Sequence, residues 1–278
     1  MLANRMKGEK QMTLDIDELG KFAADIVKEA GALLKELRTE PIKLEEKGDH
    51  ANLVTFVDQE VEKFLVDNIL EKYPDHGVVG EEGVFENVLT NFETEWVIDP
   101  IDGTTNFIHN FPFYGISVGI VHKGEGLIGV VYNPVTDELF YGQKGNGAYV
   151  NGDRLTISPE IQLSEALVAT SMFWENIWTK DALHHSIIQL YKETRGVRMV
   201  GGAAITLCEI AKGTLNAYIV PMLSTWDYAG GVIILKEAGG SISQLSGSPV
   251  SFELGGSILA AHPSIHQELL NMYVDWID

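Results

Sequence analysis

Apolar residues at three- and four-residue spacing predict two amphipathic helices near the start of the chain. The first is expected over Asp15–Leu37, with Pro41 shortly beyond its end. The second is expected over about Thr55–Tyr73, where Pro74 ends it. The polar stretch Glu45–Asn52 between them is expected to form a mobile loop.

The pattern changes from Trp96 onwards to short β-branched runs separated by turn residues. Glycines and the pairs Asn-Pro and Asn-Gly mark the turns. Strands are expected over Phe113–His122, Leu127–Tyr132, Glu138–Tyr141 and Ala148–Val150. Short runs joined by tight turns predict an antiparallel sheet.

The second half of the chain alternates between predicted strands and helices, as α/β folds do. The expected strands are 166–171, 197–200, 215–220 and 257–261, and the expected helices are 178–194, 203–212, 226–237 and 264–273. We therefore expect an α+β half over residues 13–155 and an α/β half over residues 156–278, with the functional site at their junction. Residues 1–12 are expected to be a leader segment outside the fold, whether native or not.

Composition excludes several classes of protein. The chain has 278 residues, with 40 acidic and 20 basic side chains and a formal net charge of −20. This acidity argues against binding to a nucleic acid polymer, because phosphate backbones recruit Lys and Arg. A small phosphorylated ligand stays possible where a metal ion reverses the local charge.

The number of cysteines and the lengths of the apolar runs indicate where in the cell the protein works. Cys208 is the single cysteine, so no intrachain disulfide or cysteine-based zinc cluster can form. No apolar run approaches the roughly 18 residues that span a bilayer, and residues 1–12 lack the apolar segment of a secretory signal. We expect a cytoplasmic protein that binds no membrane.

The strongest chemical signal is the segment from Trp96 to Phe107. A buried strand is expected to end at Asp99-Pro100, and the carboxylates of Asp99 and Asp102 then flank the carbonyl of Ile101. Oxygen ligands of this kind suit a hard cation such as Mg²⁺. The following Gly-Thr-Thr could open a short helix whose amides face an anion. The alternative interpretation is that Asp102-Gly103 is only a turn.

Other acids also lie at the ends of predicted elements. Glu81 and Glu82 follow a short strand, Asp58 opens the second helix, and Asp227 opens a later one. Ligand sites in α/β folds gather at such ends, whereas a single acid there is more often a helix N-cap. Spacing alone does not prove that these acids converge.

Five sequence blocks in this order resemble the inositol monophosphatase family of magnesium-dependent, lithium-sensitive phosphatases. The blocks are Asn52-Leu-Val-Thr-Phe-Val-Asp58, Gly80-Glu-Glu82, Asp99-Pro-Ile-Asp-Gly-Thr-Thr-Asn-Phe107, Val200-Gly-Gly-Ala-Ala204, and Trp226-Asp-Tyr-Ala-Gly230 with Glu237-Ala-Gly-Gly240. The resemblance implies the layered αβαβα fold of sugar phosphatases, a phosphoric monoester hydrolase activity and a homodimer.

The resemblance also implies a metal ligand set and two or three Mg²⁺ ions, whose sites Mn²⁺ or Ca²⁺ can also occupy. Glu81, Asp99 and the Ile101 carbonyl would bind the first ion. Asp99, Asp102 and Asp227 would bind the second, and Glu81 would help to hold a third.

Catalytic and substrate-binding roles follow from the same resemblance. The Thr104 hydroxyl, paired with Asp58, would orient or activate the attacking water, with Glu81 as a further catalytic residue. The substrate is expected to contact the residues around both motifs, namely Asp102, Gly103, Thr104, Gly201, Gly202, Ala203 and Asp227. Lys47 in the loop and Arg198 are further candidates.

One departure from the family pattern leaves the identity of the substrate open. Inositol-specific members carry a glutamate seven residues before the metal-binding aspartate, and Val220 holds that position here. Because hydrogen bonds to hydroxyls dominate discrimination between similar ligands, we expect activity on inositol monophosphate and on other small phosphate esters. A nucleotide, NADP or fructose-1,6-bisphosphate phosphatase remains an alternative, and a noncatalytic cation-binding module is a distant one.

Two further motifs are expected to be coincidental. Ser117 lies in a Gly-x-Ser-x-Gly pattern, but within a continuous predicted strand rather than at the strand-to-helix turn that a nucleophile requires. Gly124-Glu-Gly126-Leu-Ile-Gly129 matches the dinucleotide fingerprint, yet a strand rather than a helix follows it, which favours a hairpin.

Overall fold

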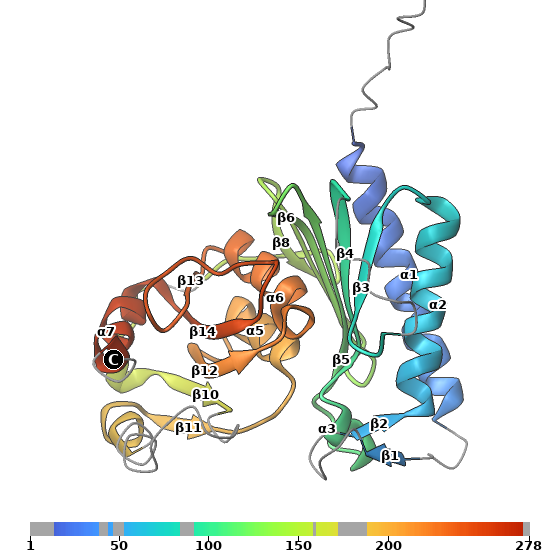
Figure 1. Ribbon diagram of the computed structural model, residues 1–278. Helices are drawn as coiled ribbons and strands as arrows, with labels where there is room; N and C mark the ends of the chain where they lie inside the picture. Colours follow the sequence, from blue (N-terminus) through green and yellow to red (C-terminus); the bar gives the residue numbers. More distant parts are fainter. Residues whose placement is uncertain are drawn as a thin grey trace, which may run out of the picture.

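The computed structural model describes residues 14–38, 44–46, 53–83, 92–157, 160–171 and 188–274. Its helices and sheets stack in five layers, which Figure 1 shows from α1 and α2 on one side to α7 on the other. This is the expected αβαβα arrangement. None of the helices in the described part of the chain is long and apolar enough to cross a bilayer.

The first two layers are a helix pair and a large sheet. α1 (Ile16–Leu37) and α2 (Phe56–Lys72) pack together on one face of the sheet. The order of its strands is β3 (Gly77–Gly80), β4 (Thr94–Asp102), β5 (Gly115–His122), β6 (Glu125–Asn133), β7 (Glu138–Gln143), β8 (Gly147–Val150) and β9 (Asp153–Leu155). All neighbours are antiparallel except the edge pair β3–β4, which is parallel.

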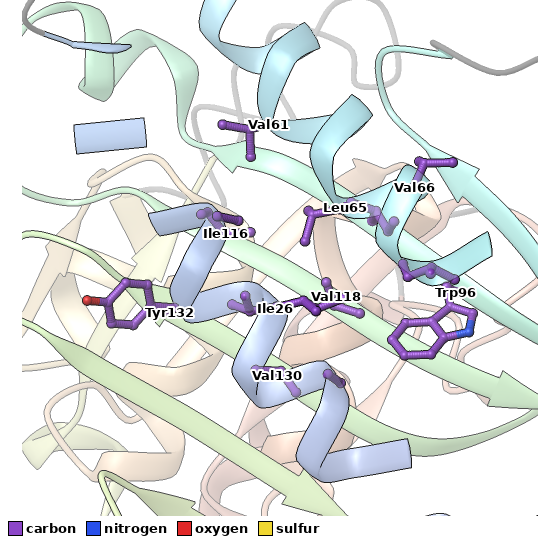
Figure 2. Packing of buried hydrophobic residues seen from close by; sticks show 14 of the residues in the cluster. Ile26, Val61, Leu65, Val66, Trp96, Ile116, Val118, Val130 and Tyr132 are labelled. Carbon is purple, nitrogen blue, oxygen red and sulfur yellow. The ribbon is translucent and has the colours of Figure 1, made fainter. Parts of the chain in front are cut away.

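The core between these two layers follows from strand alternation. Ile116 and Val118 of β5 point toward α1 and α2, where they pack with Leu65 and Trp96 (Figure 2). The intervening residue, Ser117, therefore faces the opposite side of the sheet. That opposite face is covered by α6 (Thr225–Glu237), so this sheet is buried on both sides.

The remaining layers come from the second half of the chain. α5 (Ala203–Lys212) and α6 lie between the large sheet and a mixed sheet of five strands. The order in the mixed sheet is β11 (Gly196–Arg198), β10 (Leu167–Thr170), β12 (Ala217–Leu223), β14 (Gly256–Ala261) and β13 (Ser241–Ser243). α7 (Pro263–Val274) packs on β13 and β14 as the outermost layer.

Short elements complete the fold and correct one expectation. β1 (Leu44–Glu46) pairs with β2 (Leu53–Thr55). Glu45 and Glu46, which were expected in the loop, therefore belong to a strand. Residues 47–52 of the expected loop lie outside the described residues. α3 (Thr104–Ile108) and η1 (Leu163–Glu165) are single turns. Of the helix expected over 178–194, residues 188–193 are described and are helical.

Candidate active site

Two acidic segments lie together at the carboxyl ends of β3 and β4. The strand expected to end at Asp99-Pro100 continues to Asp102, with a register shift after Asp99. β3 and β4 run parallel, with Gly80 opposite Ile98, and the Glu81 amide donates to the Ile98 carbonyl over 3.3 Å. Glu81 therefore follows β3 at the level where β4 reaches Asp99. Parallel neighbours present their carboxyl ends together, which explains how acids 18 residues apart come to lie side by side.

Asp58 and Thr104 meet although they lie on different elements. Asp58 stands in the first turn of α2, with 1% of its surface exposed, and Thr104 begins α3. The Thr104 hydroxyl oxygen is 3.1 Å from Asp58 Oδ1 and 3.1 Å from the carbonyl oxygen of Ile101. Because a hydroxyl carries one proton, Thr104 can donate to either acceptor while its oxygen accepts from a third group.

Asp102 joins the two halves of the chain. Its Oδ1 accepts from the Ala203 amide over 2.6 Å and its Oδ2 from the Ile205 amide over 2.9 Å, so it caps α5 from outside that helix. Burial raises the pKa of Asp102 to about 6, although backbone hydrogen bonds from Ile205, Ala203 and Ala204 lower it. Asp102 directly precedes Gly103, which is the N-cap residue of α3. The side chain of Asp102 is buried.

Asp227 likewise combines a structural and an electrostatic role. Its Oδ2 accepts from the Ser224 amide over 2.7 Å, as part of a capping box at the start of α6. Burial raises the pKa of Asp227 to about 7, the Ser224 amide opposes this rise, and the charge of Asp102 adds to it. Ser224 is therefore the N-cap residue and Asp227 is the third residue of the helix, so the expectation that an acid at this helix start is the N-cap itself is wrong here.

Asp99 shows that the acids converge. Burial raises the pKa of Asp99 well above its ordinary value, and the charges of Glu81, Asp102, Asp227 and Asp58 raise it further. These four residues come from different parts of the chain, and all are close enough to act on one carboxylate. Such a cluster of negative charge is unfavourable until a cation balances it.

The donor chemistry fits Mg²⁺. The converging side chains offer carboxylate oxygens, and the Ile101 carbonyl adds a backbone oxygen, which are the ligands that hard divalent cations prefer. Within the described ranges, no three Asp, Glu, His or Cys side chains are gathered closely enough to form a complete cation site. Mg²⁺ commonly keeps several waters and binds substrate phosphate, so an incomplete protein cage suits it.

The other predicted site residues are placed as follows. Gly201 and Gly202 directly precede α5, and Gly202 lies against Gly103, so the glycine pair borders the acidic cluster. Arg198 is exposed on the edge strand β11, where its guanidinium donates to the Val197 carbonyl. Lys47 lies outside the described residues.

Val220 and the two coincidental motifs also have clear positions. Val220 is fully buried in β12, within the apolar cluster between the second sheet and α5 and α6. Ser117 lies inside β5 and Gly124 in the β5–β6 hairpin, as expected. Ser117 pairs with Asp99 across the sheet, and its buried hydroxyl has no hydrogen-bond partner among the described residues.

The structure adds two residues that sequence reasoning did not single out. Glu62, one turn after Asp58 on α2 and 1% exposed, accepts from the Glu82 amide over 2.8 Å. Gly80 makes room for it, because a Cβ there would lie 2.4 Å from the Glu62 carboxyl carbon. The i, i+4 spacing of two acids on the buried face of α2 was a usable signal. The second residue is Asn106, which lies in the Asp99–Phe107 motif.

Comparison with known proteins agrees with this geometry. The sequence profile of the inositol monophosphatase family matches residues 15–276. The inositol-1-monophosphatase of Bacillus subtilis is 38% identical over 258 residues, which cover 92% of this chain and 97% of that protein.

Solved structures of the staphylococcal inositol monophosphatase SaIMPase-II are also similar. The inositol monophosphate-bound structure is 35% identical, with a TM-score of 0.80 over 93% of this chain and 94% of that one. The 2′-AMP-bound structure is 36% identical, with a TM-score of 0.81 over 93% of this chain and 95% of that one.

Proposed function

Because this chain belongs to the inositol monophosphatase family, we propose that it hydrolyses inositol monophosphate and other small phosphate monoesters with Mg²⁺ as its cofactor. The observation that supports this proposal is the buried Asp99, whose pKa is raised by burial and by the charges of four other carboxylates, beside the Thr104–Asp58 pair. Burying several like charges is unfavourable without a balancing cation, and a cation-dependent site accounts for the cluster.

Electrostatics explains why this site needs its cofactor. A phosphate monoester carries about −1.5 to −2 charges at neutral pH, and two like unit charges 4 Å apart repel by roughly 4 kcal/mol at an effective dielectric constant of 20. When bound, Mg²⁺ reverses the sign of the site, acidifies water and stabilises the charge that develops on the transferred phosphate. Two or three ions are proposed, held by Glu81, Asp99, Asp102, Asp227 and the Ile101 carbonyl.

The protein's own groups position the reactants. The Thr104 hydroxyl donates to Asp58 and so leaves its oxygen free to accept a hydrogen bond from the attacking water. The amides of Gly103 and Thr104, at the start of α3, would face the phosphate oxygens. Gly201, Gly202 and Ala203 would border the rest of the substrate. Lys47 and Arg198 remain candidate contacts to it.

Val220 supports a substrate range wider than inositol monophosphate. A buried valine offers no acceptor to ring hydroxyls, so a major source of discrimination is missing. The relative SaIMPase-II has been solved with inositol monophosphate and with 2′-AMP, and it is 35% and 36% identical to this chain in those structures. A nucleotide-directed phosphatase is therefore the second candidate.

Phosphate release across inositol, sugar and nucleotide monophosphates, with Mg²⁺ and with EDTA, tests this proposal. We expect magnesium-dependent release from several substrates. We also expect folded Asp227→Asn and Glu81→Gln proteins to lose most of it. Cation binding without release from any substrate would instead support a noncatalytic module, and release from inositol monophosphate alone would contradict the wider range.

We further propose a homodimer and a cytoplasmic location. The family resemblance supports the dimer, and the single cysteine, Cys208, buried in α5, is compatible with a reducing compartment. We also propose that the chain is organised in two halves, residues 13–155 and residues 156–278. Light scattering of the purified chain tests the dimer.

A further inference from the structure

Asn106 connects two segments of chain that are far apart in sequence. Its side-chain nitrogen donates to the Phe113 carbonyl over 2.7 Å and to the Val200 carbonyl over 2.8 Å. The second acceptor lies 94 residues away, in the other half of the chain. An amide nitrogen carries two protons, so both of its donors are used.

The segment that Asn106 holds is the glycine loop, defined here as Val200–Ala203. Gly201 and Gly202 have φ of 70° and 66°, which side-chain-bearing residues rarely adopt. A Cβ on Gly201 would lie 2.9 Å from the Asn106 nitrogen, and one on Gly202 would lie 3.2 Å from Asp102 Oδ2. Each glycine therefore packs against one side chain of the Asp99–Phe107 motif.

The glycine loop is thus attached at two neighbouring points. Asp102 accepts from the Ala203 amide at the end of the loop, and Asn106 donates to Val200 at its start. Asp102 also carries charge in the acidic cluster, whereas Asn106 is neutral. The neutral attachment can be removed without altering the charge of the cluster.

We propose that Asn106 is a positioning residue that fixes the glycine loop against the metal-binding motif and thereby sets substrate affinity. This inference rests on the proposed function, in which the loop borders the non-reacting part of the substrate. Contacts to that part act equally on the bound substrate and the transition state, so loosening them raises KM more than it lowers kcat.

Asn106→Ala is the main test, with Asn106→Leu as a second variant that has a similar shape, adds no charge and lacks both donors. Asn68→Ala is the matched control, because Asn68 donates to the Phe64 carbonyl within α2. For Asn106→Ala we expect KM to rise roughly ten-fold and at most about a hundred-fold, because substrate binding must then supply the ordering of the loop that two hydrogen bonds supplied before. We expect kcat to change far less and the control to behave as wild type.

Hydrogen exchange provides a measurement that does not depend on activity. The amides of Ala203, Ile205 and Thr206 are hydrogen-bonded at the start of α5, and we expect their exchange to accelerate in both Asn106 variants. Unchanged exchange at these amides would overturn the inference, as would a fall in kcat with KM unchanged. If the wild-type protein released no phosphate, the proposed function would fail, while the exchange result would still decide whether Asn106 holds the loop.

Discussion

Replacing Asp227 with asparagine should stabilise the metal-free protein at neutral pH while it removes a proposed cation ligand. The Asp227 carboxyl is buried, and its pKa is raised from 3.8 to about 7. Between these values the folded protein binds more protons than the unfolded chain, so its stability falls as pH rises from about 4 to about 7. Asparagine keeps an oxygen that can accept from the Ser224 amide and removes the charge.

The size of the effect follows from the pKa difference. At 1.36 kcal/mol per unit, the shift from 3.8 to about 7 corresponds to at most about 4 kcal/mol at pH 8. At pH 5 only the part between 3.8 and 5 contributes, which is about 2 kcal/mol. Asp227→Asn should therefore raise the free energy of unfolding in EDTA, and more so at pH 8 than at pH 5.

Urea denaturation with EDTA at pH 5 and pH 8, repeated with Mg²⁺, measures this directly. Mg²⁺ should stabilise the wild-type protein according to its concentration and affinity, and it should stabilise the variant less, so the two curves approach each other. The reasoning would be refuted if Asp227→Asn lowered the stability of the metal-free protein equally at both pH values. That result would mean that the capping bond, not the buried charge, dominates at this position.

The remaining predictions concern the two hydrogen-bonded pairs of the site. Thr104→Val removes the hydroxyl that meets Asp58 and should lower kcat roughly 10²- to 10⁴-fold, with the magnesium-induced rise in Tm retained; full activity would exclude a role for the hydroxyl. Glu62→Leu removes the acceptor of the Glu82 amide and should weaken Mg²⁺ binding measured by calorimetry, whereas Glu62→Gln keeps an acceptor and should largely restore it. The exposed Glu71→Gln on the same helix is the control, and equal loss in all three variants would contradict a local role for Glu62.

The local pattern of apolar residues was sufficient to predict the helices that are long and periodic. The helix expected over Ala203–Lys212 has those bounds in the structure, and the one expected from Asp15 begins at Ile16 with Asp15 as its N-cap. By contrast, β9 and β13 were not predicted. Each has three residues, and so short a strand is specified by the partner it pairs with rather than by its own alternation.

For the site, the sequence named most of the candidate residues, because Asp99–Phe107 and the acids at element ends lie in short, recognisable segments. The pairing of Thr104 with Asp58, which the resemblance implied, is made across 46 positions. No sequence pattern indicated that Asp102 caps α5 or that Asn106 holds Val200, contacts that span 103 and 94 positions. The physical reason is that a local pattern records how a segment buries its own apolar face. The distance between two polar groups depends instead on how whole layers pack, and that is settled by every residue in the core.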